Sequence, residues 1–116
     1  MLTGGMHLII DGEIKAPLSP LKARSFLRHF PRYIEMHRFT DPMVYSGPKG
    51  LAGIVGIAES HIAVHTVGTT LWLDVFSCKG FETERAVRGV VRLLGLVSHV
   101  VTLIPRPMPL PAVTPR

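Results

Sequence analysis

The fold is decided by residues 53–77, which read GIVGIAESHIAVHTVGTTLWLDVFS. Apolar residues with β-branched members fill 53–58 and 62–64, and apolar and polar residues alternate over 69–77. Short stretches of this kind are typical of strands, because branched side chains pack well on a pleated surface. The segment therefore predicts three consecutive strands in a β-meander.

A strand and a helix are predicted before the meander. Residues 6–14 open with an apolar run and are typical of a buried strand. Ser19 is a favourable N-cap residue, and Pro20 after it suits the first position of a helix. The apolar residues that follow recur at helical spacing as far as Pro31, where the pattern stops. We expect a strand followed by a short amphipathic helix.

The remaining segments complete the predicted order. Residues 33–39 are a candidate strand, and residues 40–50, with two prolines and two glycines, are typical of a loop. Residues 82–96 change to a helical period, with arginines opposite the apolar residues and Gly95 near the end. Residues 97–104 then predict a last strand.

Counted without the candidate strand 33–39, the order is β-α-β-β-β-α-β, which predicts an α+β fold, a two-layer sandwich with a mainly antiparallel sheet and two helices on one face. The other face is left free, and in so small a domain we expect a partner to cover it, as in a homodimer. A length of 116 residues with 47% hydrophobic content suffices for one core, so residues 1–104 are predicted as a single domain. Five prolines from Pro105 onward predict an extended tail over residues 105–116.

Composition and charge narrow the classes of function. The only cysteine cannot form an intramolecular disulfide and the chain opens without a secretory signal pattern, so we expect a cytoplasmic protein. Charged residues and Gly95 interrupt the apolar stretch 87–104, so no membrane partner is expected. The formal net charge is +5, but solvated helix faces account for most cations, among them Arg24, Arg28 and Arg32. Because no aromatic-interleaved basic motif accompanies them, no nucleic-acid partner is expected either.

The residues that carry chemistry lie in and just after the meander. Glu59-Ser60-His61 is followed by His65 and then by Asp74-Val75-Phe76-Ser77-Cys78. Taken singly, each has an ordinary interpretation: the serine as a turn residue, the histidines as strand residues and the cysteine as a small buried side chain. Their combination and spacing are far more specific than any one of them.

Together these motifs resemble the self-cleaving site of the prokaryotic pyruvoyl-dependent S-adenosylmethionine decarboxylases, in which an internal Glu-Ser bond breaks and the serine becomes the cofactor. The resemblance extends over about residues 4–104. It includes three further segments: Gly5-Met6-His7-Leu8-Ile9-Ile10-Asp11, His37-Arg38-Phe39 and Gly53-Ile54-Val55-Gly56-Ile57-Ala58.

The resemblance implies a role for each residue of the motif. The chain would cleave itself between Glu59 and Ser60 and leave a pyruvoyl group, the only cofactor expected, at the position of Ser60. His65 would act as the base during processing, and Cys78 would return a proton to the decarboxylated carbon of an amino-acid-type substrate. The pyruvoyl carbonyl would condense with the substrate's amino group and take up the electrons that decarboxylation leaves. No metal is expected.

One geometric difficulty accompanies these roles. Ser60 and His65 are five positions apart, so in an undistorted strand they point to opposite faces. We expect a bend or bulge between them that lets both side chains reach one site.

The substrate is less well defined than the cleavage site. Phe39 matches the family position that stacks on adenine. Members of the family usually carry Trp-Pro-Glu after the His-Thr pair, where the glutamate binds ribose, but residues 67–70 hold no glutamate. Ala52 also replaces a serine that assists processing in the family. Recognition of adenosine is therefore weakened, while the cleavage motif is intact.

Three functions remain open. The first is decarboxylation of S-adenosylmethionine for spermidine biosynthesis. The second is decarboxylation of arginine or ornithine, in which Asp11 or Glu13 would pair with the cationic side chain of the substrate. The third is a non-catalytic paralogue that regulates an active partner.

Overall fold

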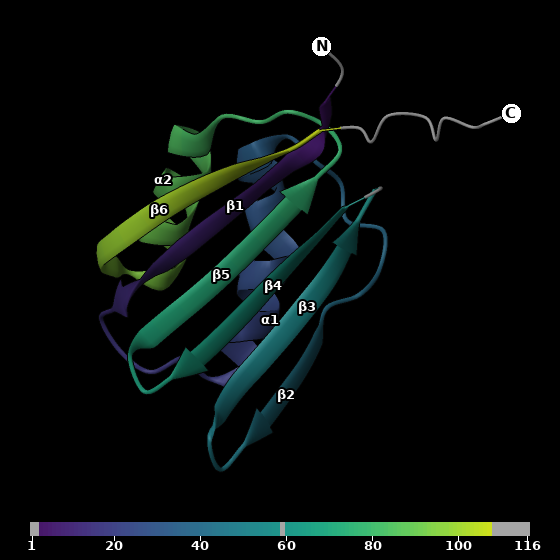
Figure 1. Ribbon diagram of the computed structural model, residues 1–116. Helices are drawn as coiled ribbons and strands as arrows, with labels where there is room; N and C mark the ends of the chain where they lie inside the picture. Colours follow the sequence, from purple (N-terminus) through teal and green to yellow (C-terminus); the bar gives the residue numbers. More distant parts are fainter. Residues whose placement is uncertain (1–2, 59, 108–116) are drawn as a thin grey trace, which may run out of the picture.

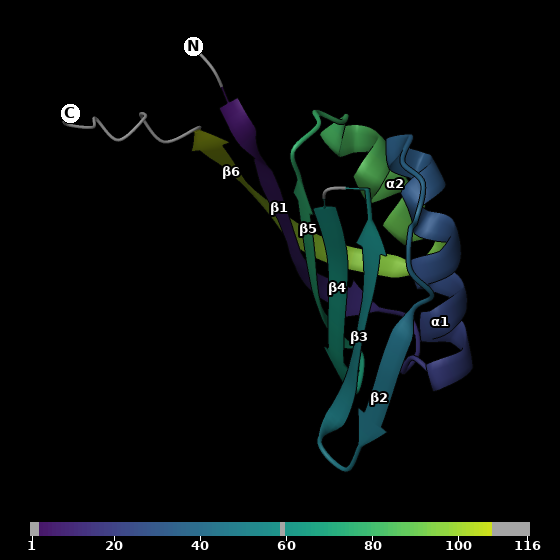
Figure 2. The same ribbon diagram turned by 90° about the vertical axis from the view of Figure 1, so that its right-hand side faces the viewer.

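The predicted meander forms three neighbouring strands of a six-stranded antiparallel sheet in a computed structural model that describes residues 3–58 and 60–107. The elements in chain order are β1 (Thr3–Ile14), α1 (Pro20–His29), the 3-10 helix η1 (Phe30–Ile34), β2 (Met43–Gly47), β3 (Gly50–Ile57), β4 (Ser60–Val67), β5 (Thr70–Ser77), α2 (Thr83–Leu94) and β6 (Leu96–Pro107). The strand order is β2-β3-β4-β5-β1-β6, and both α-helices lie on one face of the sheet (Figures 1 and 2). The predicted α+β sandwich is confirmed.

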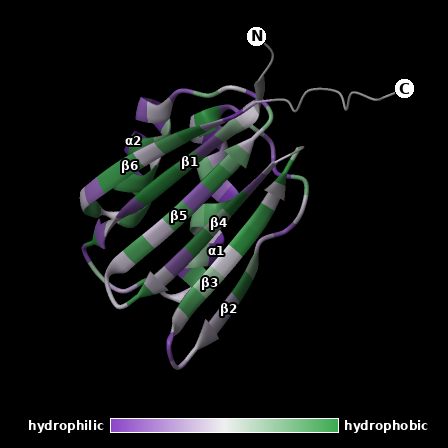
Figure 3. Ribbon diagram, in the orientation of Figure 1, coloured by the Kyte–Doolittle hydropathy of each residue, from purple (hydrophilic) through white to green (hydrophobic). Residues whose placement is uncertain are grey.

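Buried and exposed side chains alternate along the strands, so the sheet has a core face, on which the buried side chains lie, and an open face on the other side. Apolar residues alternate with polar ones along much of the sheet (Figure 3). In β3, residues 51, 53, 55 and 57 are buried and the residues between them are not; β4 and β5 follow the same period. The core face packs against helical side chains that are at most 2% exposed: Phe26, Leu27, Phe30, Ala86 and Val90. Among the described residues, no helix covers the open face (Figure 2).

The start of α1 and the end of α2 lie where local chemistry predicts them, whereas Pro31 does not end the first helical segment but lies inside η1. The Ser19 hydroxyl accepts a hydrogen bond from the Lys22 backbone N–H over 3.1 Å, and Pro20 is the first helical residue. At the end of α2, Gly95 adopts a left-handed conformation with φ 71°, which a residue with a side chain rarely adopts. Neither described helix is long and apolar enough to cross a membrane.

Two predictions between α1 and β3 are wrong. Residues 33–39 do not form a strand, because Tyr33 and Ile34 complete η1 and Glu35 follows in a left-handed conformation with φ 57°. The sheet contacts this segment only through an isolated bridge between Arg38 and Ile57. Residues 40–50 are not a loop throughout, because Met43–Gly47 forms β2 and pairs with β3 in a hairpin.

The last strand is longer than predicted. β6 continues past residue 104 and pairs with β1 as far as Pro107. As an edge strand it has one neighbour, so every second backbone N–H points away from the sheet and a proline there removes no ladder bond. The predicted extended tail therefore begins inside the sheet, and its residues 108–116 lie outside the described residues.

Candidate active site

Ser60 and Cys78 meet at the end of the meander where β4 begins and β5 ends. Ser60 pairs with Ser77 across the two strands, and the backbone N–H of Cys78 donates a hydrogen bond to the Oγ of Ser60 over 3.2 Å. The Cys78 thiol is free and exposed. This contact joins the predicted cofactor precursor to the backbone of the predicted proton donor, not to its thiol. Glu59 lies outside the described residues.

Ser77 fixes the backbone on which Cys78 sits. Its hydroxyl is fully buried, donates to the Lys79 carbonyl oxygen over 2.7 Å and accepts from the Lys79 N–H over 2.9 Å. These two bonds bracket Cys78 and close a tight turn after β5. Ser77 was not predicted as a site residue, because a serine at the end of a strand indicates no function without this contact.

His65 does not join this pair. Residues 60–67 form a regular strand that pairs with β3 and β5 without a register shift, so the expected bend between Ser60 and His65 is absent. Ser60 shares the core face with Ile62 and Val64, whereas His65 is exposed on the open face. Five residues of strand separate the two by roughly 16 Å.

Near the start of β4, other aromatic and titratable side chains lie on the open face, opposite to the face that the Ser60 side chain shares. The His61 ring stacks on Phe76 with centroids 5.8 Å apart, and the Arg106 guanidinium lies 5.6 Å from the centre of the Phe76 ring. Next to them, His7 Nε2 is 3.1 Å from Asp74 Oδ1. The pair of His7 and Asp74 was not predicted, since it depends on the register of β1 with β5.

Phe39 lies on the open face at the same end of the sheet. Its N–H donates to the Gly56 carbonyl oxygen over 2.8 Å, and the Gly56 N–H donates to Thr40 Oγ1 over 2.8 Å. A Cβ on Gly56 would lie 3.0 Å from the Phe39 ring, so glycine leaves the room that the ring occupies. The ring is 73% exposed and His61 pairs with Gly56, so the predicted adenine platform borders the Ser60 end of the face.

The two acids considered for a cationic substrate lie elsewhere. Asp11 pairs with Trp72 and is four residues along β1 from His7, roughly 13 Å. The carboxylate of Glu13 accepts hydrogen bonds from Thr69 Oγ1 at 2.8 Å and Thr70 Oγ1 at 2.9 Å. The structure does not bring either acid to Ser60.

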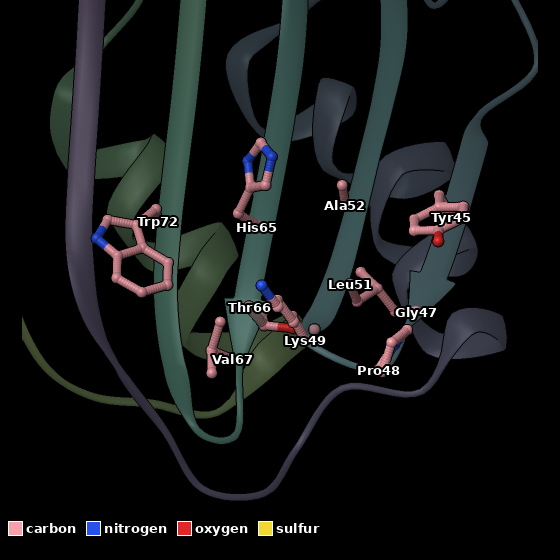
Figure 4. Close-up of a pocket in the computed structure, with 11 residues that line it drawn as sticks. Tyr45, Gly47, Pro48, Lys49, Leu51, Ala52, His65, Thr66, Val67 and Trp72 are labelled. Carbon is pink, nitrogen blue, oxygen red and sulfur yellow. The ribbon is translucent and has the colours of Figure 1, made fainter.

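A shallow cavity of about 660 Å³ occupies the opposite end of the open face. Figure 4 shows His65 between Trp72 and Ala52, with Tyr45 beyond and Lys49 below. Neither Ser60 nor Cys78 lines this cavity. His65 is therefore part of an aromatic surface that is separate from the cleavage motif in this conformation.

The fold places the chain in the class of adenosylmethionine decarboxylase-like α+β sandwiches. The crystal structure of the adenosylmethionine decarboxylase from Aquifex aeolicus VF5 matches with a TM-score of 0.75 and 19% identity, over 100% of both chains. A model of the family described as S-adenosylmethionine decarboxylase matches residues 13–107. The chain belongs to the S-adenosylmethionine decarboxylase family.

Curated relatives are similar over part of their length. The S-adenosylmethionine decarboxylase proenzyme of Geobacillus kaustophilus (strain HTA426) is 28% identical over 79 residues, which are 66% of this chain and 58% of the relative. The proenzyme of the same name from Pseudomonas paraeruginosa (strain DSM 24068 / PA7) is 37% identical over 62 residues, 51% of this chain and 39% of the relative. The matched region thus spans less than two thirds of either relative.

Proposed function

We propose that the chain is the precursor of a pyruvoyl-dependent decarboxylase, which cleaves itself between Glu59 and Ser60 and acts on S-adenosylmethionine for spermidine biosynthesis. The observation that carries the proposal is the 3.2 Å contact between the Cys78 N–H and the Ser60 hydroxyl in a member of this family. Self-cleavage agrees with the name proenzyme that both curated relatives bear.

Processing can be written with the chain's own atoms. The Oγ of Ser60 bonds to the carbonyl carbon of Glu59, the C–N bond between the two residues breaks, and the nitrogen takes the hydroxyl proton, which leaves an ester. A base then removes the α-proton of Ser60, the Cβ–Oγ bond breaks so that residues 1–59 depart as a carboxylate, and a Cα–Cβ double bond forms. The resulting dehydroalanine takes a proton at Cβ to become an imine, which water hydrolyses to the pyruvoyl carbonyl and ammonia. We assign the base to His65, which requires the start of β4 to leave its regular path during processing.

The residues around Ser60 fit a pyruvoyl group. Ser60 pairs with Ile57 on one side and Ser77 on the other, so the new chain end can remain in the sheet after cleavage. When present, the group supplies a sink for the electrons left on the substrate's α-carbon. Cys78 holds a thiol at the end of the neighbouring strand, from which that carbon can receive a proton.

S-adenosylmethionine is favoured over arginine or ornithine by the positions of the recognition residues. Phe39 offers an exposed ring at the Ser60 end of the face, whereas Asp11 lies far along β1 and Glu13 is already hydrogen-bonded. Carbon dioxide release from the three substrates, assayed side by side, tests this choice. A preference for either free amino acid would exclude adenosylmethionine as the principal substrate.

Intact mass of the purified chain separates the enzymes from the regulatory paralogue. Two fragments, residues 1–59 and 60–116, are expected for a self-processing enzyme. A single uncut chain of 12.8 kDa would favour the non-catalytic alternative.

We also propose that the processed protomers form a homodimer in the cytoplasm. The open face exposes large apolar side chains that a second copy could cover, among them Met43 (70%), Tyr45 (69%) and Val100 (67%). Light scattering should give twice the mass of one chain. A monomer at micromolar concentration would contradict the homodimer but not the proposed reaction.

A further inference from the structure

A second cavity, of about 510 Å³, shares no lining residue with the cavity around His65, and Phe39 is among the residues that line it. One wall is the C-terminal end of α1 with the start of η1, and the other is the segment 36–41 that leads to β2. The buried Pro31 and Met36 also line it. The volume is in the range of sites that hold small ligands.

Cationic groups dominate this cavity. Three arginines and two histidines line it, and the opposing acid is Asp41. The Asp41 carboxylate is already bonded, because Arg38 Nη1 donates to its Oδ1 over 3.1 Å. The cavity therefore retains an excess of positive charge after its internal ion pair is counted.

The excess positive charge lies on Arg28 and Arg32. Within residues 3–58 and 60–107, neither guanidinium makes a hydrogen bond or an ion pair with another side chain. Glu35, the nearest acid along the chain, is bonded instead by Arg85 Nη1 over 2.7 Å, outside the cavity. Like charges four residues apart repel one another, so a bound anion would remove a repulsion as well as form new bonds.

The walls are held by the fold before any ligand binds. On the helical side, His29 Nδ1 bonds the Ser25 carbonyl oxygen over 2.8 Å, which fixes the imidazole. On the other side, Phe39 and Thr40 are hydrogen-bonded to Gly56 in β3. The walls are thus ordered before binding, and the cost of ordering falls on the side chains of Arg28 and Arg32.

We propose that this cavity, between α1 and residues 36–41, binds the phosphate chain of a small polyphosphate or nucleoside triphosphate. Guanidinium groups match phosphate oxygens in paired hydrogen bonds, and two free arginines with neighbouring imidazoles can neutralise more than one phosphate. A long nucleic acid is a poorer fit, because none of the arginines of α2 lines this cavity.

Calorimetry on the purified chain with inorganic tripolyphosphate tests the site. We expect one molecule bound per chain, and about tenfold weaker binding for each of Arg28→Gln and Arg32→Gln, since one charge-assisted bond is lost. Arg92→Gln, which removes an equal charge from an exposed position at the end of α2, is the matched control and should change affinity less than twofold. Circular dichroism should show that all three variants are folded.

Three outcomes would overturn the proposal. They are no binding at low ionic strength, an equal loss of affinity in Arg92→Gln, and tighter binding of a single-stranded RNA oligonucleotide through the same two arginines. Adenosine triphosphate in a parallel titration identifies the source of the phosphates: tighter binding than tripolyphosphate supports a nucleotide, and equal binding supports the phosphate chain alone.

Discussion

Ser60 and His65 lie on opposite faces of the same regular strand, roughly 16 Å apart. No side chain can span that distance to remove the Ser60 α-proton. If His65 is the processing base, the first residues of β4 must leave the sheet once the Glu59 amide has become an ester. His61 also lies on the open face, stacked on Phe76, but it is the residue next to Ser60 and is the second candidate base.

His65→Ala and His61→Ala distinguish these two routes. We expect His65→Ala to accumulate an uncleaved ester, because it lacks the base for elimination, and His61→Ala to cleave normally. Hydroxylamine cleaves esters but not amides, so added hydroxylamine should produce two fragments from His65→Ala on a denaturing gel. The opposite pattern would assign the base to His61.

Ser60→Ala should remain a single chain of 12.8 kDa without decarboxylase activity. The alanine has no hydroxyl to attack the Glu59 carbonyl and cannot become a pyruvoyl group. Mass spectrometry gives the result directly, and Ser98→Ala, at an exposed position of β6, is a control that should cleave as the unaltered chain does. Normal cleavage of Ser60→Ala would place the site elsewhere.

Cys78→Ala should process normally but turn over slowly. Its backbone N–H still bonds the Ser60 hydroxyl, so two fragments are expected, but the proton donor is lost. General acid catalysis contributes at least about a hundredfold, so we expect kcat to fall by that order. Carbon dioxide release from the fully cleaved variant measures it. Failure to cleave would instead assign the thiol a role in processing.

The parts of the molecule that sequence predicted well are those determined by nearby residues. Strand alternation, the cap at Ser19 and the end of α2 at Gly95 all depend on local chemistry and are present as predicted. The hairpin strand β2 was missed because Val44 and Tyr45 are the strand-favouring centre of a stretch bounded by prolines, and only pairing with β3 makes it extended.

In the candidate site, too, the features that were predicted depend on nearby residues and those that were missed depend on long-range pairing. The contact between Ser60 and Cys78 follows from two adjacent antiparallel strands, which the meander predicted. The partner of His7 could not be predicted, because it depends on a long-range register in which β1 lies between β5 and β6. The bend between Ser60 and His65 was expected only because the proposed reaction needs both side chains at one site. In this conformation β4 pairs regularly with β3 and β5, so the bend is absent.

Ser77→Ala should destabilise the fold. It removes a fully buried hydroxyl that bonds both the N–H and the carbonyl oxygen of the exposed Lys79, and losing such part-buried bonds typically costs about 0.5–1.5 kcal/mol. Urea unfolding of the variant should show a lower midpoint, with Ser98→Ala again as the exposed control. An unchanged midpoint would mean that water replaces the hydroxyl, and Cys78 would then be free of the constraint assigned to Ser77.

Gly56→Ala tests whether Phe39 is the platform for the substrate's adenine. The new Cβ would lie 3.0 Å from the Phe39 ring and must displace it, so we expect KM for S-adenosylmethionine to rise roughly three- to tenfold with kcat little changed. Gly80→Ala is the matched control, since a Cβ there meets no atom within 4 Å. Because both act through the same ring, Gly56→Ala should add nothing further to the effect of Phe39→Ala in a double-mutant cycle. Additive effects would show that the two residues contact the substrate independently, and no effect of Phe39→Ala would remove the ring from the binding site.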